Sequence, residues 1–343
     1  MLLNSPPVDG PGALTASNLA VRASPRSLLR SPWLRFASRR LTSMVSVMLG
    51  LVLATFAMVR FVPGNPARLA AGLHANGAQV ALIREQLGLD HPFWIQLWVY
   101  LGNVLRLHLG TSFTYGAPVT TILAQRLPKT AELAAVALAL ALLFSVPIGI
   151  LMAALTGKGK HRWLENVFSA VSGLFASLPS FLFATFLSYI FAVTLHLLPG
   201  AGSTSPLAVA LPAIAVALPA AAMLARIVRL EALRVFEQDY VRTARSKRLP
   251  IWRIYFRHVL PNVLAGTLTI GGVFFAQMIG GVVVVENVFG WPGLGTTIVG
   301  AVISHDYPLI QGVALLLGAT MVVVNALVDV ALSFVDPKTL VRA

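Results

Sequence analysis

Six long segments of the chain carry almost no charge, and each is long enough to cross a membrane as a helix. They are residues 41–62, 133–155, 167–198, 207–228, 259–285 and 309–335. About 20 apolar residues span the roughly 30 Å hydrocarbon core of a bilayer, where the backbone must satisfy its own hydrogen bonds. With 57% hydrophobic and 11% charged residues, the chain lies outside the range of soluble domains. The pattern predicts an all-α integral membrane protein with six transmembrane helices.

The basic residues predict how these helices are oriented. Most of the 26 Lys and Arg residues fall before the first segment, between the second and third, between the fourth and fifth, or after the sixth. Because Lys and Arg concentrate in cytoplasmic loops, both termini are expected in the cytoplasm. The formal net charge of +14 therefore reflects topology, and no nucleic-acid partner is expected.

Composition also divides the chain into parts. Residues 1–40 predict a basic, mobile cytoplasmic tail, residues 41–62 the first transmembrane helix, and residues 63–130 an extracytoplasmic subdomain that is too polar to span. The tail lacks the pattern of a cleaved secretory signal, so the first apolar segment is expected to be a retained anchor. Residues 131–343 form a five-helix core, in which Pro179 predicts a kinked or tilted third helix.

Several kinds of chemistry are missing from the sequence. There is no Cys, no G-x-x-x-x-G-K-[ST] phosphate loop and no G-x-S-x-G segment. The 7 histidines form no i, i+4 pair of the kind that binds metal on a helix. We therefore expect no catalytic residue, no metal site and no bound cofactor in this chain.

Ionisable groups inside the apolar segments are few. Asp329 lies clearly within the sixth segment, and we expect it to pair with a basic side chain of the loop before the fifth segment. Arg60, at the end of the first segment, is expected to reach the interface by snorkelling, with a functional role as the alternative. A single-chain, ion-coupled secondary transporter would need midplane carboxylates and inverted repeats, which we do not find. A membrane scaffold without transport is a further alternative, and the prolines of the third to fifth segments argue mildly against it.

The stretch EALRVFEQDYVRTARSKRLPIWRIYFRHVLPN, residues 231–262, is the most basic part between two apolar segments. Its first part has a helical pattern, and its charge exceeds what orientation alone requires. Such a surface beside the membrane either binds anionic lipid or docks on a soluble partner. Composition leaves both readings open.

The same stretch resembles the cytoplasmic motif of binding-protein-dependent ABC importer permeases, written EAA, three residues, G, nine residues, I-x-L-P. Matching its L-P to Leu260 and Pro261 places the second Ala on Ala244 and the Gly on Arg248. In that family the motif forms a coupling helix, within the segment 229–258 here, that sits in a cleft of the ATPase subunit. The chain departs from the pattern at Arg248 and at Arg242, where many families have Glu.

Further motifs resemble the first permease subunit of dipeptide and oligopeptide systems, a group that includes nickel permeases. They are RFVPGNPARL, IREQLGLDHPFWIQ, LGTSF, RLPKTAEL, SLPSFLFA, VVVVENVFGWPGLG, HDYPLIQG and LVDVALSFVDPK. The resemblance implies a type I ABC importer permease fold in the bacterial cell membrane, forming half of the pore of an ATP-driven peptide importer. It implies a second homologous permease subunit, two ATPase subunits that bind ATP and Mg, an extracytoplasmic solute-binding protein and membrane lipid as partners. Nickel or another metal chelate, or haem, remains an alternative solute.

The resemblance also suggests candidate site residues. ATPase coupling is assigned to Asp239, Tyr240, Arg242, Thr243, Ala244, Arg245, Lys247, Arg248, Leu260 and Pro261. Of these, Arg242, Arg245, Lys247 and Arg248 are expected to face an acidic or polar cleft. Ser177, Ser180 and Gln277 are candidate pore residues, with helix–helix hydrogen bonding as the alternative. Glu286, Phe289 and Trp291 are candidates for the outer vestibule and the contact with the binding protein.

Arg248 stands where the motif has a glycine, a residue that ends helices with a positive φ angle. Keeping that conformation with an arginine costs about 1 kcal/mol. Alternatively, the end of the helix shifts towards Pro250, which disfavours helix at the residue before it. We expect Pro250 to supply the stop, and coupling to survive.

Overall fold

The computed structural model describes residues 32–61, 65–72, 75–86 and 88–335, without the side chains of residues 32–37, 66, 70, 158, 268–277, 279 and 331–335. Its regular elements in these residues are all helical, and a lone bridge joins Thr111 to Pro118. The predicted tail up to residue 31 lies outside the described residues. The all-α prediction is confirmed.

A helix is found at each of the six predicted apolar segments. Within the described residues, four helices are long and apolar enough to cross a membrane, and a bent pair forms a fifth candidate. Two of these spans, Ser38–Phe61 and Tyr307–Val330, lie within α1 (Pro32–Phe61) and α13 (Tyr307–Val335). The other two coincide with α5 (Val119–Thr156) and with α8 (Ala210–Phe236) together with its preceding turn Pro206–Val209. The bent pair is α6 (Arg162–Ser177) with α7 (Ser180–Leu187) and the π-helical turn Ser188–Thr194. At the predicted fifth segment, α11 (Leu260–Val288) is a 29-residue helix whose one charged residue is Glu286.

Two helices begin earlier than hydropathy predicts. α1 starts at Pro32, so residues 32–40 are helical and the predicted tail is shorter. α5 starts at Val119 and carries Lys129 and Glu132 within its outer turns, so the predicted domain boundary at residue 130 falls inside a helix. Hydropathy marks where side chains must face lipid, whereas a helix continues wherever its i→i−4 hydrogen bonds can form.

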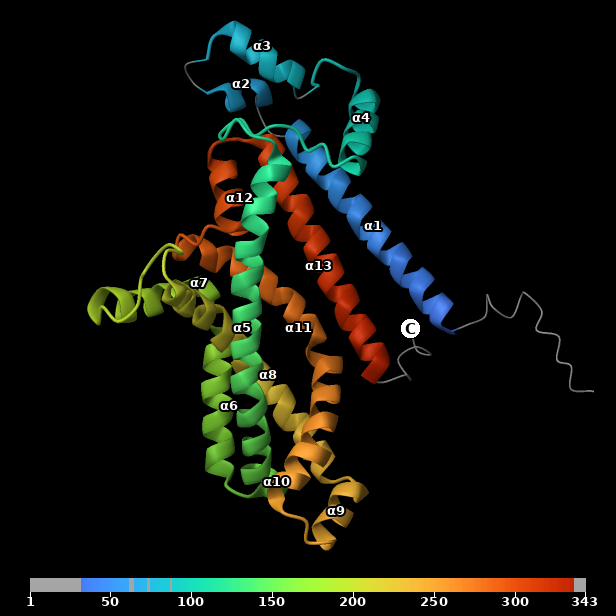
Figure 1. The fold of residues 1–343 in the computed structure, drawn as a ribbon, viewed down its shortest axis with the longest axis vertical. Coiled ribbons are helices and arrows are strands. Elements are labelled where there is room, and N and C mark those ends of the chain that lie inside the picture. Colours follow the sequence, from blue (N-terminus) through green and yellow to red (C-terminus); the bar gives the residue numbers. More distant parts are fainter. Residues whose placement is uncertain (1–31, 62–64, 73–74, 87, 336–343) are drawn as a thin grey trace, which may run out of the picture.

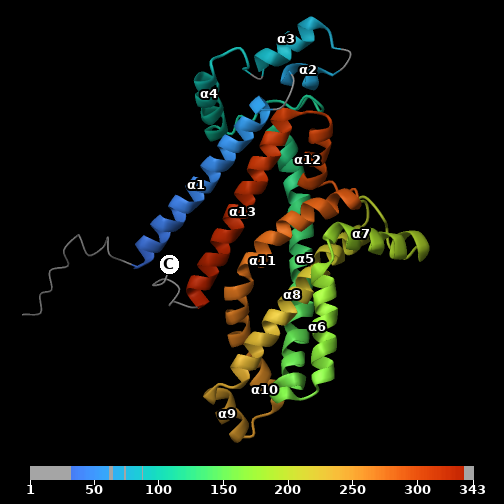
Figure 2. The same ribbon diagram turned by 180° about the vertical axis from the view of Figure 1, so that it is seen from behind.

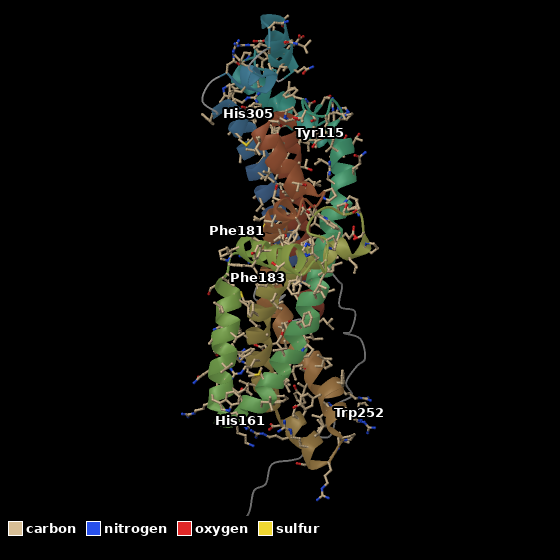
Figure 3. The ribbon with its side chains drawn as sticks, turned by 90° about the vertical axis from the view of Figure 1, so that its left-hand side faces the viewer. Tyr115, His161, Phe181, Phe183, Trp252 and His305 are labelled. Carbon is tan, nitrogen blue, oxygen red and sulfur yellow. The ribbon has the colours of Figure 1, made fainter. Side chains whose placement is uncertain are left out.

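The third segment is sharply broken, as Pro179 predicts. α6 and α7 meet at an angle of 97°, and Leu178 between them has an extended backbone, with ψ of 126°. Proline has no N–H to donate and disfavours helix at the residue before it. α7 therefore points sideways from the bundle (Figure 1), and it carries Phe181 and Phe183 at mid-height (Figure 3).

The remaining elements lie at the two ends of the molecule. α2 (Pro66–Ala71), α3 (Gly77–Gln86) and α4 (Phe93–Leu105) form a subdomain at one end, with α12 (Leu294–Ile303) below it (Figures 1 and 2). The short helices α9 (Asp239–Ser246) and α10 (Ile251–Ile254) lie at the opposite end. The positive-inside pattern predicts that the α9 end faces the cytoplasm and that the subdomain lies outside, and this placement stays a prediction.

Close packing of α5 on α8 forms the centre of the bundle. Gly149 of α5 lies against Val228 and Ala225 of α8, and a Cβ atom at residue 149 would lie 2.6 Å from Val228 Cβ. Buried alanines, among them Ala137 and Ala141, continue this face of α5. Small residues let two membrane helices approach closely enough for extensive van der Waals contact.

An ion pair joins the first and last of these helices, which lie side by side in both views (Figures 1 and 2). Asp329 of α13 pairs with Arg40 of α1, and each side chain is about one-third exposed. The prediction that its partner comes from the loop before the fifth segment is wrong. Hydropathy could not identify the partner because Arg40 seemed to belong to the tail, whereas it lies on α1.

Candidate coupling site

The helix α9, which lies within the predicted coupling segment, is fixed to the bundle by one apolar face. Val241 and Ala244, three positions apart and therefore on the same side of a helix, are exposed by 0% and 4%. They lie in a cluster with Val228 and Ala232 of α8 and with Val259. Ala244, one of the predicted coupling residues, thus serves as a packing residue.

The opposite face of α9 is exposed and basic. Its exposed side chains are those of Asp239, Tyr240, Arg242, Thr243, Arg245, Ser246, Lys247 and Arg248. Four of these side chains are cations, those of Arg242, Arg245, Lys247 and Arg248. Within the described residues, Arg242 is the only one of the four with an acidic group within 4 Å, at 3.6 Å from Asp239. Pro261 is also exposed, and Leu260 is half-buried at the start of α11. Partial burial raises the pKa of the Tyr240 hydroxyl, which keeps it neutral at physiological pH.

Arg248 ends α9 in the left-handed conformation, with φ of +51°. The Leu249 N–H donates to the Ala244 carbonyl at 3.3 Å, and the Arg248 N–H donates to the Arg245 carbonyl at 2.9 Å. These two bonds form a Schellman motif, which normally has glycine at the left-handed position. The expectation that Pro250 supplies the stop is wrong, because α9 ends at Ser246 and Pro250 instead precedes α10.

Aromatic side chains lie around this basic face. The Arg245 guanidinium carbon lies 5.6 Å from the ring centre of Phe236. Trp252 and Phe256, on the following turns, are 62% and 68% exposed, and Trp252 lies at the same end of the molecule as His161 (Figure 3). Exposed aromatic and arginine side chains together are typical of surfaces that bind another protein.

Polar contacts connect this end of α8 to three other helices. Arg229 donates to Thr156 Oγ1 of α5 at 2.9 Å and forms a 2.7 Å ion pair with Glu165 of α6. Glu231 is 8% exposed and lies against Gly266 of α11, where a Cβ atom would come within 2.5 Å of its Oε2. These contacts join this end of α8 to α5, α6 and α11.

The residues predicted for the outer vestibule are inside the protein. Glu286, Phe289 and Trp291 are exposed by 0%, 1% and 2%. The Trp291 Nε1–H donates to the Lys129 carbonyl at 2.9 Å. Their side chains cannot form the predicted contact surface for a binding protein. The sequence did not reveal this, because a turn rich in glycine and proline looks exposed until its packing partners are known.

Two of the three candidate pore residues, Ser177 and Ser180, lie on either side of the break in the third segment. Ser177 is exposed and donates to the Gly173 carbonyl of its own helix at 2.8 Å, and Ser180 follows Pro179 and lies near Gly281 of α11. The Gln277 side chain lies outside the described residues. A pore lined by these residues stays a prediction.

Sequence reasoning did not single out Asp306, which is fully buried. Its carboxylate accepts from Ser112 Oγ at 2.5 Å and from the Thr114 N–H at 3.0 Å. It also accepts from the Leu309 N–H at the start of α13. An aspartate just before the first turn of a helix is an N-cap signal, and that signal in HDYPLIQG could have identified it. Within the described residues no group of acids and histidines is arranged to hold a metal.

Sequence comparison identifies relatives over nearly the whole chain. Residues 145–341 match the family described as binding-protein-dependent transport system inner membrane component, and residues 33–134 match the N-terminal part of such membrane components. A putative peptide transport system permease protein of Brucella abortus is 38% identical over 88% of this chain and 97% of its own length. The glutathione transport system permease protein GsiC of Pectobacterium atrosepticum is 37% identical over 89% of this chain and 98% of its own.

The fold is similar to a solved structure as well. In inward-facing structures of the MetNI methionine ABC transporter, a chain superposes with a TM-score of 0.53, covering 63% of this chain and 96% of that one. Sequence identity over this match is 18%, so the likeness concerns the fold.

Proposed function

The chain belongs to the binding-protein-dependent transport system inner membrane components, the permease subunits of bacterial ABC importers, and we propose that it imports peptides. The observation that carries this proposal is the 38% identity to a putative peptide permease over 97% of that protein's length. Glutathione, named for a second relative, is a tripeptide, so both names indicate peptides as solutes. An ion-coupled transporter working as a single chain is not favoured.

In this proposal the chain supplies half of the pore, and a second, homologous permease subunit supplies the other half. Two ATPase subunits bind ATP and Mg and hydrolyse the nucleotide, while an extracytoplasmic binding protein delivers the solute. Arg242, Arg245, Lys247 and Arg248 on the exposed face of α9 dock in a polar or acidic cleft of one ATPase subunit. Their lack of strong internal ion pairs in the described residues supports this docking, because their charges remain available to a partner.

Coupling then follows from how α9 is held. Val241 and Ala244 fix α9 to the cluster that contains Val228 of α8, so movement of the docked helix moves α8. The contact of Glu231 with Gly266 carries the same movement to α11. ATP-driven closure of the ATPase subunits would thus rearrange two helices of the permease core.

The test is uptake by the reconstituted complex. The chain is purified with the subunits that accompany it and placed in proteoliposomes with its binding protein and radiolabelled trialanine. ATP-dependent uptake that survives collapse of ion gradients by ionophores is the expected result. Uptake that requires an ion gradient and no ATP, or purification of the chain without ATPase subunits, would refute the proposal.

A further inference from the structure

A cavity of about 160 Å³, with several polar side chains in its wall, lies where the subdomain meets the outer ends of α1 and α13. Its wall combines residues from α1, the end of α3, α4, α13 and the two loops that flank α4. The polar side chains most relevant to its chemistry are those of Arg60, His91, Gln96, Tyr100, Asn103 and His108. None of its described lining residues is acidic, so a guanidinium faces a wall without a counter-charge.

Arg60 is fixed in place. Its Nε donates to Gln96 Oε1 at 2.8 Å, its Nη2 contacts the same oxygen, and its guanidinium carbon lies 4.2 Å from the ring centre of Phe56. Gln96 is anchored in turn, since its Nε2 donates to the His91 carbonyl at 2.5 Å. Arg60, which was expected to reach the interface by snorkelling, is thus held by contacts within the protein at the end of α1.

The Arg60 guanidinium has more N–H groups than its described hydrogen bonds use. A guanidinium carries five N–H groups, and within the described residues its recorded hydrogen bonds go to Gln96 alone. Burial raises the pKa of the Tyr100 hydroxyl, and this hydroxyl shares a 3.0 Å hydrogen bond with Thr55 Oγ1. The planar fork of an unpaired arginine matches a carboxylate or phosphate.

We propose that this cavity is an extracytoplasmic binding site for the carboxylate group of a small solute, held by Arg60 with Asn103 and His108 at its wall. A cavity of this size accepts a carboxylate and the few atoms attached to it. The site rests on the proposed function for the identity of the solute, which would be the C-terminus of an incoming peptide. A lipid phosphate shares the chemistry, and the experiment separates the two.

The test is a binding titration on the purified full-length chain in nanodiscs of phosphatidylcholine. The probes are trialanine and trialaninamide, which differ in the C-terminal carboxylate. We expect trialanine to bind at least 10-fold more tightly than trialaninamide. Arg60→Gln should lose at least 10-fold in trialanine affinity. Arg60→Lys keeps the charge without the planar fork, and its affinity should lie between those of the unaltered chain and Arg60→Gln. Arg68→Gln, an exposed cation on α2 outside the cavity, is the matched control and should bind as the unaltered chain does.

Equal affinity for the two probes, no binding of trialanine, or an unchanged Arg60→Gln variant would each overturn the site. A further outcome would also overturn the proposed site and assign the cavity to lipid. In that outcome phosphatidylglycerol stabilises the unaltered chain but not the Arg60→Gln variant, and trialanine has no effect on either. If Arg60→Gln fails to fold, Asn103→Leu alters the wall while leaving the contacts of Arg60 intact, and it should weaken trialanine binding. The binding titration does not need the ATPase subunits, so its result is independent of the uptake assay. If trialanine binds but is not taken up, the proposed function is refuted and the binding site is not.

Discussion

The carboxylate of Glu286 accepts a 2.7 Å hydrogen bond from Thr130 Oγ1, across 156 residues of sequence. Its other oxygen accepts from the Gly295 N–H at 2.5 Å, and Thr130 Oγ1 accepts from the Leu294 N–H at 2.8 Å. These bonds satisfy donors at the first turn of α12, which would otherwise be unpaired. One buried carboxylate therefore ties together α5, α11 and α12.

Removing this carboxylate should destabilise the outer end of the protein. Glu286→Ala leaves Thr130 and the Gly295 N–H without an acceptor in a site closed to water, and it opens a cavity. We expect a loss of about 3 kcal/mol in the free energy of unfolding, measured as a lower midpoint in thermal unfolding in detergent. Asn287→Ala is the control, because Asn287 is exposed and bonds within its own helix. Equal midpoints for the two variants would contradict this role.

A second prediction concerns the glycines that make room for this carboxylate. A Cβ atom on Gly295 would lie 2.7 Å from Glu286 Oε2 and 2.6 Å from Val283 Cα, whereas one on Gly300 of the same helix would meet nothing within 4 Å. Gly295→Ala should cost about 2 kcal/mol of stability through overpacking. Gly300→Ala should be neutral or gain up to about 1 kcal/mol from helix propensity. Unfolding curves of the two variants, compared at equal detergent concentration, check the difference.

A third prediction addresses the ion pair between Arg40 and Asp329. Both groups are partly exposed, so their coupling should be modest, about 1 kcal/mol. A double-mutant cycle with Arg40→Gln and Asp329→Asn isolates it, because each single variant leaves one charge unpaired and the double variant leaves none. The loss in unfolding free energy of the double variant should be smaller than the sum of the losses of the two single variants. Strict additivity of the unfolding free energies would show that the pair contributes nothing.

The helices could be predicted from the sequence because the membrane imposes a strong rule. An uncharged run of about 20 residues has few alternatives to a transmembrane helix, and Pro179 gave the position of the break. The start of α5 at Val119 could not be found in this way, since Lys129 and Glu132 are polar residues on a helix that continues past the lipid. Helix ends outside the membrane depend on local packing and hydrogen bonds.

The sequence predicted a basic helix before Leu260 and Pro261, and the structure has an exposed helix there. The role of this helix in coupling stays a prediction. The burial of Glu286 could not be predicted, because it depends on Thr130, which comes from another helix. The conformation of Arg248 was equally hidden, since a left-handed arginine is recognised from backbone angles and not from residue type.

Replacing Arg248 separates the effects of its backbone from those of its charge. Arg248→Gly removes both the charge and the left-handed strain, whereas Arg248→Ala removes the charge and keeps a Cβ atom at a φ of +51°. The glycine variant should therefore be more stable than the alanine variant by about 1 kcal/mol. Lys247→Gly and Lys247→Ala form the control pair, where φ is −75° and alanine should be the more stable. The same order at both positions would argue against strain at Arg248.

The last prediction tests docking itself. Arg245→Glu combined with Lys247→Glu reverses two charges on the exposed face of α9 while leaving Val241 and Ala244 in their cluster, so the chain should still insert and fold. If an acidic or polar cleft receives this face, repulsion should uncouple ATP hydrolysis from uptake and lower the uptake rate by more than 10-fold. Arg68→Glu with Arg106→Glu makes the same change in charge on exposed residues of the outer side and should leave the ratio of uptake to hydrolysis unaltered. Uptake at the unaltered rate by the α9 variant would exclude the docking role, because no other described contact of these two side chains could compensate for the reversal.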